Sequence, residues 1–188
     1  MPQTEKPVES PPRRGRPRDP ERLRRILEAA HSHFASKEGL FEAVIRDRTD
    51  RVVGGLAGVE ALDSKQPRKA LLAIGEQFLT LAREEATLGQ FRSVYGAAGT
   101  QREACRAFYR QGADRLIGDL AAYLRRADAQ GALNVRHPRQ AADLFLSMFL
   151  GDGHIRGLLM LEMPDAREDR ALLREAVRVF MAAYAKAP

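Results

Sequence analysis

A long row of apolar residues at helical spacing is the feature that most constrains the fold of this chain. Its members are Cys105, Phe108, Tyr109, Gly112, Leu116, Leu120, Tyr123, Leu124 and Ala127. This spacing places them on one face of an α-helix, whereas a half-buried strand would alternate apolar and polar residues. Thr100 and Glu103 have the spacing of a capping box. We therefore predict a helix that begins near Thr100, buries one face and ends before Gly131.

The same periodicity recurs along most of the chain. Its 188 residues are rich in Ala, Leu, Arg and Glu and contain no long alternating apolar pattern, so we expect an all-α protein with a substantial core. A loop is predicted over Asp63–Pro67. Further helices are expected to begin at Asp19–Glu21 and at Ser36–Glu38, and to cover about 70–84, 88–98, 138–161 and 165–185, the last with a capping box at Asp165 and Glu168.

The positive charge is concentrated at the N-terminus. Residues 1–25 hold eight Lys/Arg and four Asp/Glu, which gives +4 of the total +6 and leaves +2 for the rest. Five of the ten prolines lie in residues 1–18, and such a segment cannot bury enough apolar surface to order itself. We expect a basic arm with a polyanionic partner; a tail that only solvates the protein is the alternative.

The sequence gives little support for a catalytic or metal-binding function. Cys105 is the single cysteine, which excludes a disulfide framework and a cysteine-based zinc cluster and suits a reducing cytoplasm. We expect Cys105 to be a buried, inert thiol, and His31, His33, His137 and His154 to be solvated or capping residues, because none has metal-ligand spacing to a carboxylate. The apolar runs are too short to cross a bilayer. We predict a cytoplasmic protein that is not an enzyme and has no cofactor, metal or membrane association.

The arm has the form of a minor-groove DNA ligand. In Arg14-Gly15-Arg16-Pro17-Arg18, glycine lets the backbone lie deep in the groove, and arginines meet its negative potential. A capped helix follows at once, as in proteins whose arm flanks a groove-reading unit. The DNA-contacting residues predicted from this segment are Arg13, Arg14, Arg16, Arg18 and Arg22.

Two segments resemble the helix-turn-helix domain of the TetR family of transcription regulators. Ile26–Ala30 is similar to the first helix of that domain, and Phe34–Phe41 to the stretch that leads into its fourth helix. The resemblance implies a DNA-binding repressor controlled by a small molecule. It also implies a contact of Lys37 with the DNA backbone.

The two matching segments lie unusually close together. Eight residues separate Leu27 from Ser36, whereas two helices and their turn need about 20 to 30 residues. We therefore expect residues 19–45 to form a partial helix-turn-helix domain whose reader helices are missing near residues 31–36. Residues 1–18 form the arm, and residues 46–188 the ligand-binding and dimerisation domain. The alternative function is a dimeric small-molecule-binding protein without sequence-specific DNA binding, with an enzyme as a distant third.

The segment from Ala70 to Tyr123 is similar to the AefR-like C-terminal type of the family. That resemblance implies a helical bundle that holds a small effector and forms a homodimer through its last two helices. Aromatic residues that could line a pocket for a mostly apolar effector are Phe78, Phe91, Tyr95, Phe108, Tyr109, Tyr123 and Phe149. Any one of them could instead belong to the core.

The last two predicted helices are apolar over more than one face, which favours a four-helix dimer interface. The expected interface residues are Leu144, Met148, Ile155, Leu159, Val177, Phe180, Met181 and Tyr184. The alternative is that these helices complete the core of a monomer.

Overall fold

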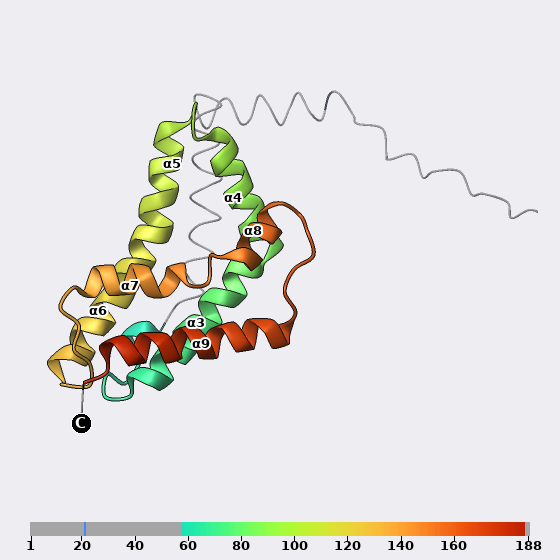
Figure 1. Cartoon of the computed structure of the whole chain (residues 1–188). Helices are drawn as coiled ribbons and strands as arrows, with labels where there is room; N and C mark the ends of the chain where they lie inside the picture. The colour runs from blue at the N-terminus through green and yellow to red at the C-terminus, as the bar shows by residue number, and fades with distance from the viewer. Residues whose placement is uncertain (1–20, 22–57, 187–188) are drawn as a thin grey trace, which may run out of the picture.

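A computed structural model of the chain describes Glu21 and residues 58–186, and every element in that part is helical. The elements are η2 (Val59–Ala61), α3 (Pro67–Arg83), α4 (Glu85–Ala97), α5 (Arg102–Tyr109), the π-helical turn η3 (Arg110–Asp114), α6 (Arg115–Ala129), α7 (Pro138–Ser147), α8 (Asp152–Leu158) and α9 (Ala166–Tyr184) (Figure 1). The prediction of an all-α protein is confirmed for this range. The boundary expected between residues 45 and 46 lies outside it.

The first two long helices begin and end where local chemistry requires. Asp63 closes the loop before α3, since its carboxylate accepts a hydrogen bond from the backbone N–H of Lys65 at 2.9 Å. Pro67 occupies the first turn of α3, where a missing N–H costs nothing. Glu84 then takes an extended conformation, with ψ of 131°, and separates α3 from α4. The predicted loop and both predicted helices are confirmed.

The helix predicted from the long apolar row is confirmed as the run α5–η3–α6. Its capping-box start is wrong: Gln101 is the N-cap without a side-chain cap, and the Thr100 hydroxyl donates to the carbonyl of Ala97 at 3.3 Å instead. The run contains one π-helical turn around the buried Gly112. Gly131 follows its end with φ of +73°, a left-handed conformation that favours glycine.

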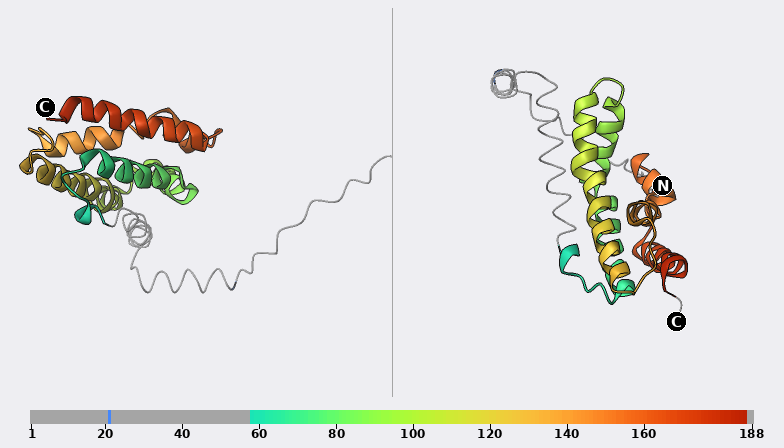
Figure 2. Two further views of the ribbon diagram at one scale, coloured as in Figure 1. Left: turned by 90° about the horizontal axis from the view of Figure 1, so that it is seen from below. Right: turned by 90° about the vertical axis from the view of Figure 1, so that its left-hand side faces the viewer.

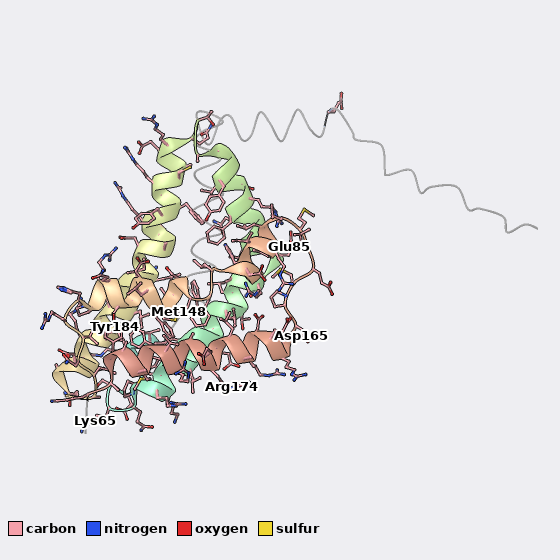
Figure 3. The ribbon with its side chains drawn as sticks, in the orientation of Figure 1. Lys65, Glu85, Met148, Asp165, Arg174 and Tyr184 are labelled. Carbon is pink, nitrogen blue, oxygen red and sulfur yellow. The ribbon has the colours of Figure 1, made fainter. Side chains whose placement is uncertain are left out.

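The helix predicted over residues 138–161 is divided in two. Gly151 has ψ of −141° and stands between α7 and α8 as the N-cap of the second. The capping box of α9 is confirmed, because the Asp165 carboxylate accepts from the N–H of Arg167 and Glu168 at 2.7 and 2.8 Å, and Glu168 accepts from the N–H of Asp165 at 2.8 Å. Asp165 and Tyr184 mark the two ends of α9 in Figure 3.

The core lies where α3, α6, α7 and α9 meet. Helix α3 packs against α9, and α6 packs against α7 (Figures 1 and 2). Phe145 is fully buried and makes edge-to-face contacts with Phe149 and Phe180, each with ring centroids 5.3 Å apart. Gly75 allows the close approach of α3 to α9, since a Cβ there would lie 2.6 Å from Cδ1 of Leu173. Among the described residues, no helix combines the length and apolar character needed to cross a bilayer.

Candidate functional site

An apolar cavity of about 270 Å³ lies beside the core, enclosed by helices α3 to α7. Its size is just below the range of about 300–1,000 Å³ that is typical of small-molecule sites. The π-helical turn η3 forms part of its wall, and such turns occur frequently at functional sites. The lining residues are Phe78, Leu81, Ala82, Thr87, Gln90, Phe91, Tyr95, Phe108, Tyr109, Gly112, Ala113, Leu116, Ile117, Asp143, Leu146, Ser147 and Leu150.

Phe91 is the centre of the aromatic wall. Its ring centroid lies 5.3 Å from that of Phe108 in an edge-to-face contact and 5.7 Å from that of Tyr95. Tyr95 and Tyr109 are 58% and 53% exposed, so they form the part of the wall that reaches solvent. The cavity therefore brings together five of the seven aromatic residues proposed from the sequence: Phe78, Phe91, Tyr95, Phe108 and Tyr109.

The other two aromatic residues lie in the core and do not line this cavity. Tyr123 and Phe149 are fully buried. The Tyr123 hydroxyl donates to the carbonyl of Asp63 at 3.1 Å. Burial, followed by the nearby charge of Asp63, raises the pKa of Tyr123 to about 12. Periodicity could not separate these two residues from the pocket residues, because core and pocket lie on the same apolar helix faces.

Two polar side chains that sequence reasoning missed lie in the α4 wall of the cavity. Thr87 and Gln90 are 4% and 2% exposed and stand one turn apart. The Thr87 hydroxyl has no hydrogen-bond partner among the described residues. Their signal in the sequence is weak: two polar residues at i and i+3 on a helix that also carries Phe91 and Val94.

Charged residues are almost entirely absent from the lining of the cavity. None of the described residues that line it is Lys, Arg or His, and its single carboxylate is that of the exposed Asp143. A buried anion without a cationic partner is strongly disfavoured. The enclosed part of the cavity therefore suits a neutral, mostly apolar molecule.

His154 does not have the solvated position expected from the sequence. It is only 4% exposed, and its ring meets that of Phe91 edge-on with centroids 5.1 Å apart. Burial lowers the pKa of His154, a hydrogen bond to the backbone of Ala82 opposes that effect, and the charge of Arg83 adds to it. The histidine thus supports the cavity wall from behind as a neutral ring. Cys105, predicted to be buried, is half-buried, and its thiol points to the carbonyl of Val94 at 3.7 Å.

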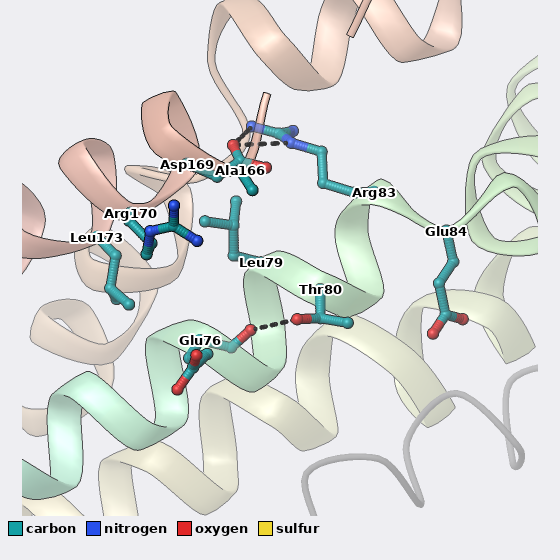
Figure 4. A pocket seen from close by; sticks show the side chains of 9 residues that line it. All are labelled: Glu76, Leu79, Thr80, Arg83, Glu84, Ala166, Asp169, Arg170 and Leu173. Atoms are coloured by element: carbon teal, nitrogen blue, oxygen red, sulfur yellow. Dashed lines mark hydrogen bonds and ion pairs between the residues drawn. The ribbon is translucent and has the colours of Figure 1, made fainter. Parts of the chain in front are cut away.

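A second, open groove of about 340 Å³ runs between α3 and α9 (Figure 4). The carboxylate of Asp169 meets the guanidinium of Arg83 at 3.2 Å, and the Thr80 hydroxyl donates to the carbonyl of Glu76 at 2.9 Å. The Arg83–Asp169 ion pair joins α3 to α9, whereas the Thr80 hydrogen bond lies within α3. The groove therefore serves helix packing better than recognition of an apolar molecule.

The residues predicted for a dimer interface separate into three groups. Leu144, Ile155 and Leu159 are 50%, 53% and 64% exposed. Val177 and Phe180 are each 1% exposed and belong to the core. In this structure those two side chains are therefore not accessible to a partner subunit. Met148, Met181 and Tyr184 are partly buried against the same core.

The residues proposed to contact DNA cannot be placed. Arg13, Arg14, Arg16, Arg18, Arg22 and Lys37 lie outside the described residues. Within the described part, no group of three His, Cys, Asp or Glu side chains could hold a metal ion.

Comparison with known proteins gives consistent results. Residues 69–186 match the family model of the AefR-like transcriptional repressor, C-terminal domain. The fold is similar to a TetR-family transcriptional regulator from Mesorhizobium loti (TM-score 0.77, 20% identity, 85% of this chain and 80% of that one). It is also similar to the flavonoid-responsive regulator FrrA (0.72, 24%, 84% and 80%) and to a TetR regulator from Agrobacterium tumefaciens (0.66, 22%, 85% and 78%).

A comparison with curated protein sequences gives no significant match. The family model nevertheless covers more than half of the chain. The family consists of regulators and not of enzymes, as expected from the sequence. The chain therefore belongs to the TetR family of transcriptional regulators, with an AefR-like C-terminal domain in residues 69–186.

Proposed function

We propose that the protein is a homodimeric repressor whose DNA binding is controlled by a small, mostly apolar effector held in the cavity between α3 and α7. The observation that carries this proposal is the apolar, aromatic cavity inside a domain of the TetR family. The effector acts by favouring one spacing of two N-terminal DNA-binding units over another. Its effect is limited by the difference between its affinities for the two states.

The aromatic wall favours an effector that contains a flat ring. Phe91 and Phe108 are already in edge-to-face contact, and a third ring can join such a cluster with offset or edge-on geometry. FrrA, which has a similar fold, is described as flavonoid-responsive. That description supports the same class of effector for this chain.

The exposed apolar residues of α7 and α8 supply a surface for the homodimer. Leu144, Ile155 and Leu159 are each at least half exposed, as are the neighbouring Met160 and Leu161. A two-fold dimer would cover the same patch on both subunits. DNA contacts are assigned to the basic arm and to Lys37.

A specific sequence observation favours a second candidate function. The eight residues between Leu27 and Ser36 leave no room for a recognition helix. Without that helix, the arm offers only phosphate and minor-groove contacts, which are salt-sensitive and weakly selective. The second candidate is a dimeric small-molecule-binding protein that lacks sequence-specific DNA binding.

Selection of duplexes from a random-sequence pool, followed by affinity measurements at several salt concentrations, decides between the two. The repressor requires an enriched site that binds more tightly than random duplex at every salt concentration and is released by the effector. Equal affinity for all duplexes, with the same steep salt dependence, would refute the repressor and support the second candidate.

A further inference from the structure

The apolar cavity adjoins another hollow, an open groove on the outside of the domain that is distinct from the groove between α3 and α9. Tyr109, Ala113, Ile117 and Asp143 line both the cavity and an open groove of about 700 Å³. The groove extends over the exposed side of α6 and the first turn of α7, and it borders the cavity along the four shared residues. The two hollows therefore adjoin at the part of the cavity that reaches solvent, where Tyr109 is 53% exposed and Asp143 is exposed.

The two compartments differ in charge. The groove is lined by three arginines, Arg125, Arg136 and Arg139, and by one acid, Asp143, so these four side chains carry a net charge of +2. Arg139 is paired with the carboxylate of Asp114. Arg125 and Arg136 are exposed and have no ion-pair partner in the part of the chain that the structure describes.

We propose that this two-compartment site binds an amphiphile with an apolar tail and an anionic head group. The tail occupies the cavity, and the head group lies in the groove beside Arg125 and Arg136. The anion cannot enter the cavity, because no cation lines it and desolvation of the charge would be too costly. In the groove the same charge remains hydrated and meets two guanidinium groups that suit carboxylate or phosphate oxygens.

This inference rests on the proposed function of the cavity, but it adds a recognition element that the cavity lacks. Residues of α6 and of the segment before α7 bind the charged head group, whereas Asp143 opposes its binding. Asp143 lines both compartments, so its carboxylate repels an anionic head group and has little effect on a neutral one.

The test measures binding of decanoate and of 1-decanol to the full chain by calorimetry at low and high salt. The two probes have the same chain length and differ in the charge of the head group. We expect decanoate to bind more tightly than 1-decanol at low salt, with an advantage that shrinks as salt screens the charges. We expect Arg125→Gln combined with Arg136→Gln to weaken decanoate about 2- to 30-fold, from about 0.2–1 kcal/mol per exposed pair. Binding of 1-decanol should not change.

Two further variants complete the design. Asp143→Asn should strengthen decanoate binding and leave 1-decanol binding unchanged, which reverses the sign of the arginine effect. Arg102→Gln removes an exposed arginine that lines neither compartment and should change neither affinity.

The outcomes separate this inference from the proposal on which it rests. If 1-decanol binds but decanoate gains nothing from Arg125 and Arg136, the charged compartment is refuted and the apolar effector site stands. If neither probe binds, a linear tail does not enter the cavity, so this inference is refuted while the proposal of a flat-ring effector is not. If the arginine variant weakens both probes equally, the arginines act on the fold rather than on the head group, and the inference is again refuted.

Discussion

The change Ile155→Ala tests whether the exposed face of α8 is covered by a second copy of the chain. Ile155 is 53% exposed, so about half of its side chain is available to a partner. Full burial of such a side chain contributes about 1.5–3 kcal/mol, and half of that is about 0.75–1.5 kcal/mol per subunit. The same residue counts twice in a two-fold dimer. We therefore expect a loss of about 1.5–3 kcal/mol, or about a 13- to 160-fold higher dissociation constant.

Sedimentation equilibrium over a range of protein concentrations measures that constant directly. Tyr109→Ala is the matched control, because Tyr109 has the same exposed fraction as Ile155 but lines the cavity and the outer groove. Because the other half of the Ile155 side chain is buried in the monomer, the free energy of unfolding of the monomer should fall by about 1 kcal/mol in the Ile155 variant. A dissociation constant that moves no more than in the Tyr109 variant would refute the assignment of α8 to the interface.

Three further predictions concern the fold. Thr87→Val removes a buried hydroxyl without a partner and should raise the free energy of unfolding by about 1 kcal/mol in urea titrations; a loss would show that the hydroxyl is satisfied. Gly75→Ala should cost up to about 2 kcal/mol, since about 1–3 kcal/mol of overpacking against Leu173 exceeds about 1 kcal/mol of helix propensity. Gly96→Ala, with nothing within 4 Å of its Cβ, should be neutral or stabilising. The lowered pKa of His154 means that the unfolded chain binds its proton first as pH falls. Stability should therefore be constant above about pH 6.5 and decline below it, and His154→Phe should make that decline shallower in unfolding curves measured from pH 7.5 to about pH 5.

Most of the helical framework could be predicted from the sequence because its signals are local. The apolar rows of α3 and α6 and the capping box of α9 each act within a few residues. Thr100 and Glu103 show the limit of such signals, since the same spacing precedes α5 but its side chains do not form the cap. Whether an apolar residue faces a core, a cavity or a partner depends on which helices surround it. For that reason the sequence predicts Tyr123 in the pocket and Phe180 in the interface, whereas both are buried in the core.

The break between α7 and α8 connects the cavity to the proposed dimer surface. A continuous helix over residues 138–161 would keep one apolar face throughout, as its periodicity suggested. Gly151, with ψ of −141°, interrupts the helix and reorients the residues that follow, so that His154 turns inward onto Phe91 and Ile155 turns outward. Of these two adjacent residues, His154 therefore contacts the cavity wall, and Ile155 belongs to the surface proposed to meet a second subunit. An effector that displaces Phe91 must move His154 or leave a gap beside it, and densely packed interiors resist such gaps. Through the contact between Phe91 and His154, the cavity is therefore linked to the proposed dimer surface by adjacent residues.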